Sequence, residues 1–225
     1  MIKVENIEIF GLDGAMRGMR NPLNSWDKAD TTVYQGHDKE FVNIGVNDLN
    51  LATRLIKAGT EHRKFLRMIH VQMDVTAPLY WWKEADTYKV GTTANSCSTM
   101  HKIAAKEFTL DDFSHDHLFN DAVVYNGYVP TSVLECVIGA LNEFRNLYLE
   151  TKDKRYWWQM IQLLPSSYNQ RRTWDMSMET LLSILHQRKN HKLDEWNEFR
   201  DICLEQVPYL KEFYEASLKE TTNEN

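Results

Sequence analysis

The chain has 225 residues, of which 43% are hydrophobic and 26% are charged, and its net charge at pH 7 is −6. This composition is typical of a soluble globular protein that is long enough to bury a full core, and the negative charge argues against a general nucleic-acid binder, which needs a basic face. No segment has the apolar length of a membrane span, and the N-terminus lacks the apolar core of a signal peptide, so we expect a cytoplasmic protein that binds neither nucleic-acid polymers nor membranes.

Two strands and a helix are predicted in the first part of the chain, up to residue 76. Residues 3–10 are expected to form a short strand, and residues 11–39, rich in Gly, Asn and Asp, a long loop. A helix is expected from residue 47 and can be closed by Gly59. Apolar and polar residues alternate over residues 69–76, which predicts a strand with one polar face.

The rest of the chain is predicted to be largely helical. A short helix is expected at residues 79–88, and the small polar residues of 91–99 form either a pocket lining or a plain loop. Further helices are expected at residues 131–150, 156–164, 174–188 and 193–206. We therefore predict one α/β (α+β) domain over residues 1–218, with a mixed or antiparallel sheet packed with helices, and a polar tail at residues 219–225.

Two arginines are the first candidates for ligand binding. Arg171 and Arg188 lie on the two sides of one stretch with helical periodicity, and the polar Gln170 precedes the first of them. A guanidinium stays charged and offers a planar fork of donors, which suits phosphate and carboxylate groups. The alternative is that each arginine is a helix cap or a surface ion-pair partner.

Three segments carry a resemblance to a known family. They are the strand that ends at Ala77-Pro78 before an aromatic-rich helix, the Leu164-Pro165 segment with Arg171, and the helix that ends in Arg188 before Glu195-Trp196. Over roughly residues 47–210 the sequence resembles the flavin-dependent thymidylate synthases, in a divergent branch of the kind found in phages and prophages. The resemblance implies an α/β fold, a homotetramer, and methylation of deoxyuridylate (dUMP) with FAD, NADPH and methylenetetrahydrofolate.

The same resemblance implies roles for individual residues. From Leu164 to Arg188 the family pattern aligns without a gap, which places Arg171 and Arg188 on two nucleotide-binding arginines that clamp the phosphate and the pyrimidine edge. Gln170 and Asn95 are then expected to read the base. The residues expected to donate hydrogen bonds to phosphate oxygens are Thr92, Ser96 and Ser98.

The sequence departs from the family where the flavin and nucleotide sites join. Thr87-Tyr88-Lys89 stands in place of an Arg-His-Arg signature, and Thr92, Cys97 and Thr99 stand for two later serines and an arginine. Only Lys89 keeps its charge, so donors that would hold a flavin phosphate or ring carbonyl are lost. The loss of these donors argues against FAD binding more strongly than against nucleotide binding. His62 and Lys89 are the remaining candidates for cofactor contacts, and Lys89 is also a candidate for contacts with the nucleotide.

Other reactive side chains allow two interpretations each. Cys97 is either a nucleophile for C6 of a pyrimidine or an inert small residue, and the three cysteines fit neither a disulfide framework nor a zinc pattern. His115 and His117 suggest either a metal site or a solvated acidic loop, and we predict no metal. The basic group that begins at His62 is either a flavin contact or a surface ion-pair cluster.

Two pairs of tryptophans occur on predicted helices, Trp81-Trp82 and Trp157-Trp158. Adjacent helical positions point about 100° apart, so each pair is expected to place one ring in the core and one at an interface or pocket. Two functions remain open: a nucleotide-binding enzyme that transfers a one-carbon unit to C5 of dUMP or a related pyrimidine nucleotide, with Arg188 and Cys97 as catalytic candidates, or a non-catalytic protein that sequesters a nucleotide.

Overall fold

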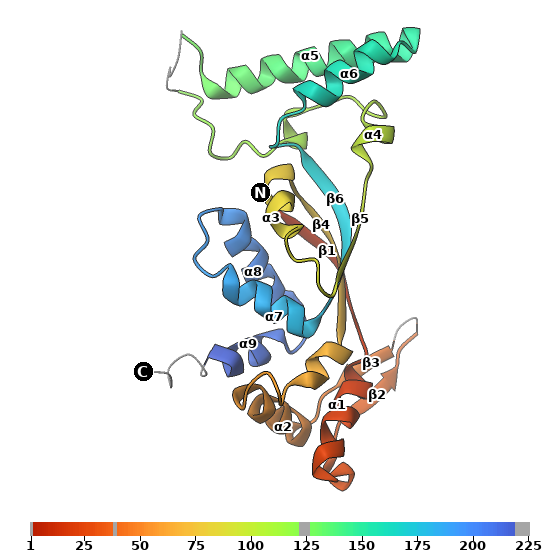
Figure 1. Ribbon diagram of the computed structural model, residues 1–225, viewed down its shortest axis with the longest axis vertical. Coiled ribbons are helices and arrows are strands. Elements are labelled where there is room, and N and C mark those ends of the chain that lie inside the picture. The colour runs from red at the N-terminus through yellow and green to blue at the C-terminus, as the bar shows by residue number, and fades with distance from the viewer. Residues whose placement is uncertain (1, 38–39, 122–126, 219–225) are drawn as a thin grey trace. The chain divides into compact units, whose positions relative to one another are not determined.

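The computed structural model of the protein describes residues 2–37, 40–121 and 127–218 (Figure 1). Its strands are β1 Lys3–Phe10, β2 Thr32–Gln35, β3 Glu40–Asn43, β4 His70–Pro78, β5 Thr92–Ser96 and β6 Asn169–Ser177. Its helices are α1 Leu12–Arg20, α2 Val46–Lys57, α3 Leu79–Ala85, α4 Thr99–Lys102, α5 Pro130–Thr151, α6 Lys154–Leu163, α7 Met178–Gln187, α8 Asp194–Gln206 and α9 Leu210–Leu218. Short 3-10 turns cover Asn21–Leu23, Trp26–Lys28, Lys64–Met68 and Leu110–Asp112.

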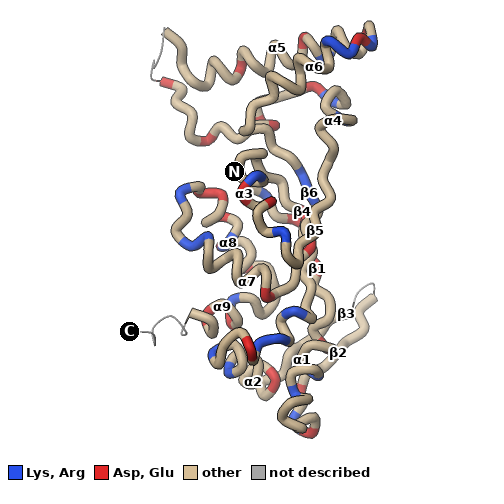
Figure 2. The backbone as a smooth tube through the Cα atoms, viewed as in Figure 1, with Lys and Arg blue, Asp and Glu red and all other residues tan. Residues whose placement is uncertain are grey.

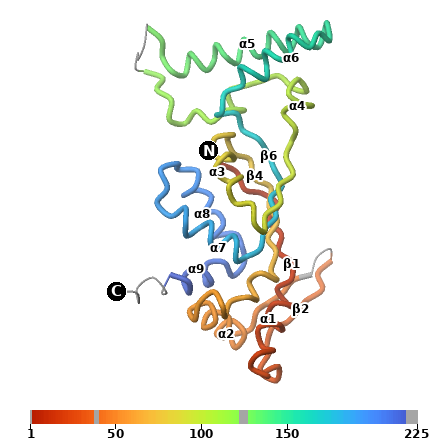
Figure 3. Tube along the Cα trace, in the orientation of Figure 1, coloured from red at the N-terminus to blue at the C-terminus, as the bar shows by residue number. Residues whose placement is uncertain are grey.

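The chain forms two compact units, which can be followed along the trace in Figure 3. Unit 1 is built from Met1–Lys3, Val75–Thr87 and Asn95–Arg172, and unit 2 from Val4–Asp74, Tyr88–Ala94 and Thr173–Asn225. Four strands pair in the order β1-β4-β6-β5, and each of them has residues in both units. A separate antiparallel pair, β2 with β3, belongs to unit 2.

Strand β4 has one apolar and one polar face. Val71, Met73, Val75 and Ala77 are fully buried, whereas the residues between them are more exposed. In β6 the same alternation buries Trp174 and leaves its neighbours in the strand more exposed. The side chains of successive strand residues point to opposite faces, so the two central strands of the sheet each bury one face.

Each unit has its own apolar core. In unit 1, helices α5 and α6 lie side by side (Figure 1) and contribute to a cluster of buried side chains. Its members are Ile103, Phe108, Phe113, Leu134, Ile138, Leu141 and Met160. In unit 2 the buried side chains of α7, α8 and α9 include Leu181, Leu185, Trp196, Phe199, Leu210 and Phe213.

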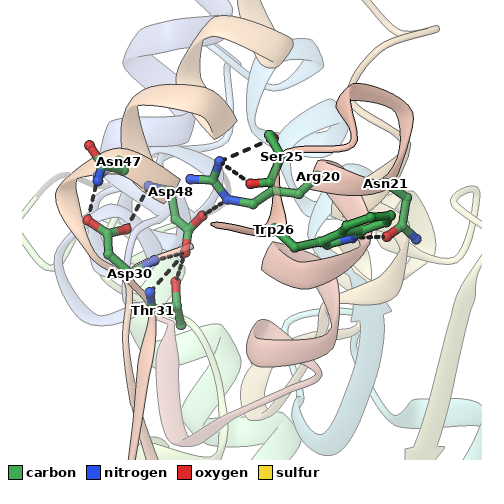
Figure 4. A network of polar contacts seen from close by, with 8 residues as sticks. All are labelled: Arg20, Asn21, Ser25, Trp26, Asp30, Thr31, Asn47 and Asp48. Atoms are coloured by element: carbon green, nitrogen blue, oxygen red, sulfur yellow. Dashed lines mark hydrogen bonds and ion pairs between the residues drawn. The ribbon is translucent and has the colours of Figure 1, made fainter. Parts of the chain in front are cut away.

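A buried ion pair organises the N-terminal part of unit 2 (Figure 4). Arg20 Nε donates to Asp48 Oδ1 at 2.5 Å, and the two side chains are 4% and 1% exposed. Asp48 Oδ2 also accepts hydrogen bonds from the backbone and hydroxyl of Thr31, at 2.9 and 2.6 Å. Asp30 in turn accepts from the backbone N–H groups of Asn47 and Asp48 in the first turn of α2. The loop between α1 and β2 is thereby tied to two helices.

The predicted fold class, an α/β protein with an antiparallel sheet packed with helices, is confirmed. The strands expected at 3–10 and 69–76 are present, as are the helices expected at 131–150, 156–164 and 193–206, within a few residues at each end. The single-domain prediction stays a prediction, and the predicted tail at 219–225 lies outside the described residues. Within the described ranges, no helix is long and apolar enough to span a bilayer.

The secondary structure differs from the sequence-based expectation in several places. The stretch 11–39 contains α1 and β2, because Leu12, Ala15, Met16 and Met19 form a buried helical face that the intervening glycines obscured. The stretch 91–99, expected to form either a pocket lining or a plain loop, contains β5, an edge strand whose side chains are mostly exposed. Helix α9 had no predicted counterpart.

The helix predicted at 174–188 begins only at Met178, because the preceding residues belong to β6 and Ser177 caps the helix by accepting from Thr180 N–H. The expectation for Trp81-Trp82 was also wrong, since both rings are buried, at 0% and 1% exposed. Trp158 does reach the surface, at 44% exposed.

Breaking the buried Arg20–Asp48 ion pair is expected to destabilise the protein strongly. Replacing Asp48 by Ala leaves the Arg20 guanidinium buried without its carboxylate, which should lower the free energy of unfolding by about 3–5 kcal/mol, measured by urea denaturation. Asp13→Ala is the control, because the Asp13–Arg17 pair at 3.1 Å is exposed and such pairs contribute only about 0.3–0.5 kcal/mol. Equal losses for the two variants would contradict this account.

The same carboxylate predicts how stability depends on pH. Burial raises the pKa of Asp48, but hydrogen bonds from Thr31 and Arg20 outweigh it, and the pKa lies below its usual value. The stabilisation is therefore present above the unfolded pKa of about 3.9 and is lost as the pH falls through the lower, folded pKa. Urea denaturation from pH 6 to 3 should show a steeper loss of stability in the wild type than in Asp48→Ala.

Candidate functional site

Unit 1 contains a cavity of about 500 Å³ beside the N-terminal end of β6. The strands contribute Lys3, Thr76, Asn169, Gln170 and Arg171 to its lining. The segment that follows β5 contributes Cys97, Ser98, Thr99, Lys102, Ile103 and Lys106. A third group comes from residues 111–116, and Tyr168 completes the lining. All of these residues belong to unit 1.

Gln170 holds the strand side of the cavity in place. Its side chain is 7% exposed, and its Nε2 donates to the carbonyl oxygen of Cys97 at 2.7 Å. Its Oε1 accepts from Arg172 Nε at 3.0 Å, and its backbone carbonyl accepts from Trp82 Nε1 at 2.9 Å. Both ends of the amide are therefore engaged within the protein, which gives Gln170 a structural role that the sequence did not reveal.

The two neighbouring arginines of β6 differ in their surroundings. Arg172 stacks its guanidinium over the ring of Trp82, 4.3 Å from the centroid, and pairs with Asp86 at 2.7 Å. Arg171 is exposed and lines the cavity. Arg172 is therefore held by contacts within the fold, whereas Arg171 belongs to the lining of the cavity.

Three lysines add positive charge to the same lining. Lys3 lies in β1, Lys102 in α4 and Lys106 shortly after it, and Figure 2 shows the basic positions at α4. Lys106 forms an ion pair with Asp112, so its charge is compensated locally. Lysines and arginines within one cavity favour an anionic ligand such as a phosphate.

Tyr168 supplies the aromatic part of the lining. Its ring packs edge-on against Phe113, with centroids 5.7 Å apart, and against Phe108 at 6.2 Å. Burial, followed by the nearby Asp112 and Cys97, raises the pKa of Tyr168 above its usual value. The phenol therefore stays protonated at neutral pH and offers a hydrogen-bond donor together with an apolar ring.

Arg188 lies in unit 2, at the C-terminal end of α7. Its Nε donates to the hydroxyl of Tyr88 at 2.8 Å, and its Nη1 lies 3.1 Å from His191 Nε2. The guanidinium also lies over the rings of Tyr88 and Trp196, 5.3 and 4.8 Å from their centroids. Tyr88, the middle residue of the altered signature, is thus a direct partner of Arg188.

The predicted site residues fall into three groups. Cys97, Ser98, Gln170 and Arg171 line the cavity of unit 1. Asn95 and Ser96 lie in β5 with exposed side chains, outside that lining. In unit 2, Lys89 is exposed, and the Thr92 hydroxyl donates to the carbonyl of Tyr88.

His62 lines a second cavity of about 430 Å³, in unit 2. The lining is mostly apolar, with Met19, Leu55 and Phe65, and Glu61 and Lys64 accompany His62. The cofactor role of His62 stays a prediction. Its neighbour Arg63 forms an ion pair with Glu179 at 3.1 Å, and the two side chains are 13% and 16% exposed.

Sequence reasoning missed several cavity residues. Lys3, Lys102 and Tyr168 carry no motif, because the fold brings them together from distant parts of the chain. His115 was expected to belong either to a metal site or to a solvated acidic loop; it lines the cavity, whereas His117 is not part of the lining. Among the residues that the structure describes, no three His, Cys, Asp or Glu side chains converge as a metal site.

Comparison with known proteins identifies the fold. No family model matches the sequence, and no curated protein matches it as a relative. The structure is similar to thymidylate synthase ThyX from Helicobacter pylori, solved with FAD and dUMP, with a TM-score of 0.66 and 16% identity over 96% of this chain and 99% of the other. It is also similar to the UMP/dUMP methylase PolB from Streptomyces cacaoi, solved with 5-Br dUMP, with a TM-score of 0.63 and 14% identity over 97% of this chain and 95% of the other.

These likenesses confirm the predicted resemblance at the level of fold. They cover nearly the whole of each chain, so the fold is shared from end to end and is not confined to one motif. At 14–16% identity the likeness shows a shared fold.

The contact between Tyr88 and Arg188 can be tested by removing one atom. Tyr88→Phe deletes the hydroxyl that accepts from Arg188 Nε, which should lower the free energy of unfolding by about 1.5–3 kcal/mol, the range for a hydrogen bond to a charged group. Tyr34→Phe is the matched control, because Tyr34 is 56% exposed. If thermal or urea unfolding gives the same stability for both variants, the contact does not hold Arg188 as described.

Proposed function

We propose that the chain binds a pyrimidine nucleoside monophosphate, dUMP or a close relative of it, in the cavity of unit 1. The observation that carries the proposal is the presence of Arg171, Lys3 and Lys102 in one cavity. A terminal phosphate is the ligand group that such a set of donors binds best. Arg171 is also the residue that the family resemblance assigns to the nucleotide.

The dimensions and polarity of the cavity support a ligand of this kind. Its volume of about 500 Å³ lies within the range of about 300–1,000 Å³ that small-molecule sites usually have. Tyr168 supplies an aromatic surface, and Ser98, Thr99 and Asn169 supply neutral polar groups. Proteins of the same fold were solved with dUMP, 5-Br dUMP and 5-Br UMP, which makes a pyrimidine the first base to test.

Flavin binding receives less support from the residues of this chain. The hydroxyl of Thr87 donates to the carbonyl of Glu84 at 2.7 Å, Tyr88 contacts Arg188, and Lys89 is exposed. This triplet does not provide the paired guanidinium groups that would clamp a flavin phosphate. We therefore infer that FAD, if it binds, uses other groups, for which His62 is the remaining candidate, and we derive no flavin-dependent step.

One-carbon transfer to C5 of the bound pyrimidine is the second candidate function. The observation that favours it is that the exposed Cys97 lines the same cavity as Arg171 and Lys102. A thiolate there would add to C6 and make C5 nucleophilic. The resemblance further leads us to propose a homotetramer.

The nucleotide proposal predicts the effect of removing Arg171. Arg171→Ala should weaken dUMP binding by about 1.5–3 kcal/mol, because a charge-assisted contact with the phosphate is lost, as measured by calorimetry. Arg155→Ala is the control in the same unit, since Arg155 is exposed, pairs with Asp153 at 2.6 Å and does not line the cavity. Unchanged affinity in a folded Arg171→Ala variant would overturn the assignment.

A further inference from the structure

Tyr168 brings an aromatic ring into the unit 1 cavity, whose lining is otherwise mainly charged and polar. The ring is partly buried, and it packs edge-on against Phe113 and Phe108, with interplanar angles of 66° and 68°. Both phenylalanines are almost fully buried, at 1% and 4% exposed. The core of unit 1 therefore holds this ring in its place in the lining.

The backbone of Tyr168 is fixed as well. Its N–H donates to the carbonyl oxygen of Pro165 at 3.0 Å, and its own carbonyl accepts from the N–H of Leu79 at 3.0 Å. It also forms an antiparallel bridge with Phe113. A side chain that already has one position loses little conformational entropy when a ligand binds to it, so this ring is preorganised for a ligand.

The next residue, Asn169, also lines the cavity and has a buried acceptor that lacks a donor. Its Oδ1 is inaccessible to bulk water and receives no hydrogen bond from the residues that the structure describes. Its Nδ2 lies 3.5 Å from the backbone carbonyl oxygen of Asp111, which can only accept, and this contact sets the orientation of the amide. Because a buried acceptor without a donor is unfavourable, we expect a bound ligand to supply the donor.

The phosphate of the proposed nucleotide does not provide this donor. Near pH 7 a phosphate monoester is largely a dianion, whose oxygens accept hydrogen bonds, and the cationic side chains of Arg171, Lys3 and Lys102 match it instead. The donor must then come from the sugar or from the base. Of these two groups, the aromatic ring of Tyr168 beside the amide favours the base, because a flat base stacks on an aromatic side chain.

We propose that Tyr168 is a specificity-determining residue of this site, that its ring packs on the pyrimidine base, and that Asn169 Oδ1 accepts a hydrogen bond from the same base. The inference rests on the proposed function, in which the cationic side chains bind the phosphate. It assigns the two ends of the ligand to different parts of the lining. The cavity thereby distinguishes a nucleotide from the sugar phosphate that lacks a base.

The test compares dUMP with 2-deoxyribose 5-phosphate, which lacks the base, by calorimetry. The ratio of the two dissociation constants measures the contribution of the base, because both ligands carry the same phosphate and sugar. The wild type should bind dUMP about tenfold more tightly, as expected for one stacked base.

In Tyr168→Leu the ratio should fall by about fivefold or more, while the affinity for 2-deoxyribose 5-phosphate stays unchanged. Tyr168→Phe keeps the ring and should keep most of the ratio. Asn169→Ala removes the acceptor and should lower the ratio by about threefold, as expected for one hydrogen bond.

Tyr156→Leu is the matched control, because Tyr156 lies in α6 of the same unit and does not line the cavity; it should keep the wild-type ratio. Thermal unfolding identifies the variants that fold, and Tyr168→Met takes the place of Tyr168→Leu if the latter does not.

If the loss of the Tyr168 ring weakens both ligands equally, the ring only shapes the cavity, and the inference fails while nucleotide binding stands. An unchanged ratio in either site variant would overturn the assignment of that residue to the base. Equal affinity of the wild type for the two ligands would overturn the inference and leave a site for sugar phosphates. If the folded wild type binds neither ligand, the proposed function and the inference both fail.

Discussion

Gln170 is the residue on which the cavity of unit 1 depends. Its buried amide joins the start of β6 to the carbonyl of Cys97 and to Arg172, and its backbone accepts from Trp82. A buried amide that loses such partners costs about 1–3 kcal/mol for each unpaired group, so these contacts hold one another in place. The arginine between Gln170 and Arg172, Arg171, lines the same cavity as Gln170.

Most of the fold could be predicted from the sequence because its clearest hydrophobic patterns were periodic. The alternation in β4 and the helical pattern of α5 each place buried residues on one face, and the hydrophobic effect enforces such patterns. Helix α1 was missed because Gly14 and Gly18 lower its local helical propensity, and packing of Met16 and Met19 compensates for that. In α1, burial of these apolar side chains therefore outweighs the low helical propensity of the glycines.

Only some residues of the candidate site could be predicted from the sequence, and the reason is physical. Arg171 and Cys97 could be found because they lie within segments that carry the family pattern. Lys3 and His115 could not, because their proximity depends on strand order and on the bridge between Phe113 and Tyr168. Such contacts join residues that are far apart in the chain, and no local pattern encodes them.

Protection of Cys97 from alkylation tests the central claim, that the cavity of unit 1 holds the nucleotide, most directly. The chain carries its own reference, because Cys97 and Cys136 are exposed whereas Cys203 is buried, and only Cys97 lines this cavity. Mass spectrometry after treatment with iodoacetamide should show slower modification of Cys97 when UMP or dUMP is present, with Cys136 unchanged. An unchanged rate at Cys97 under saturating nucleotide would place the ligand elsewhere and contradict the account.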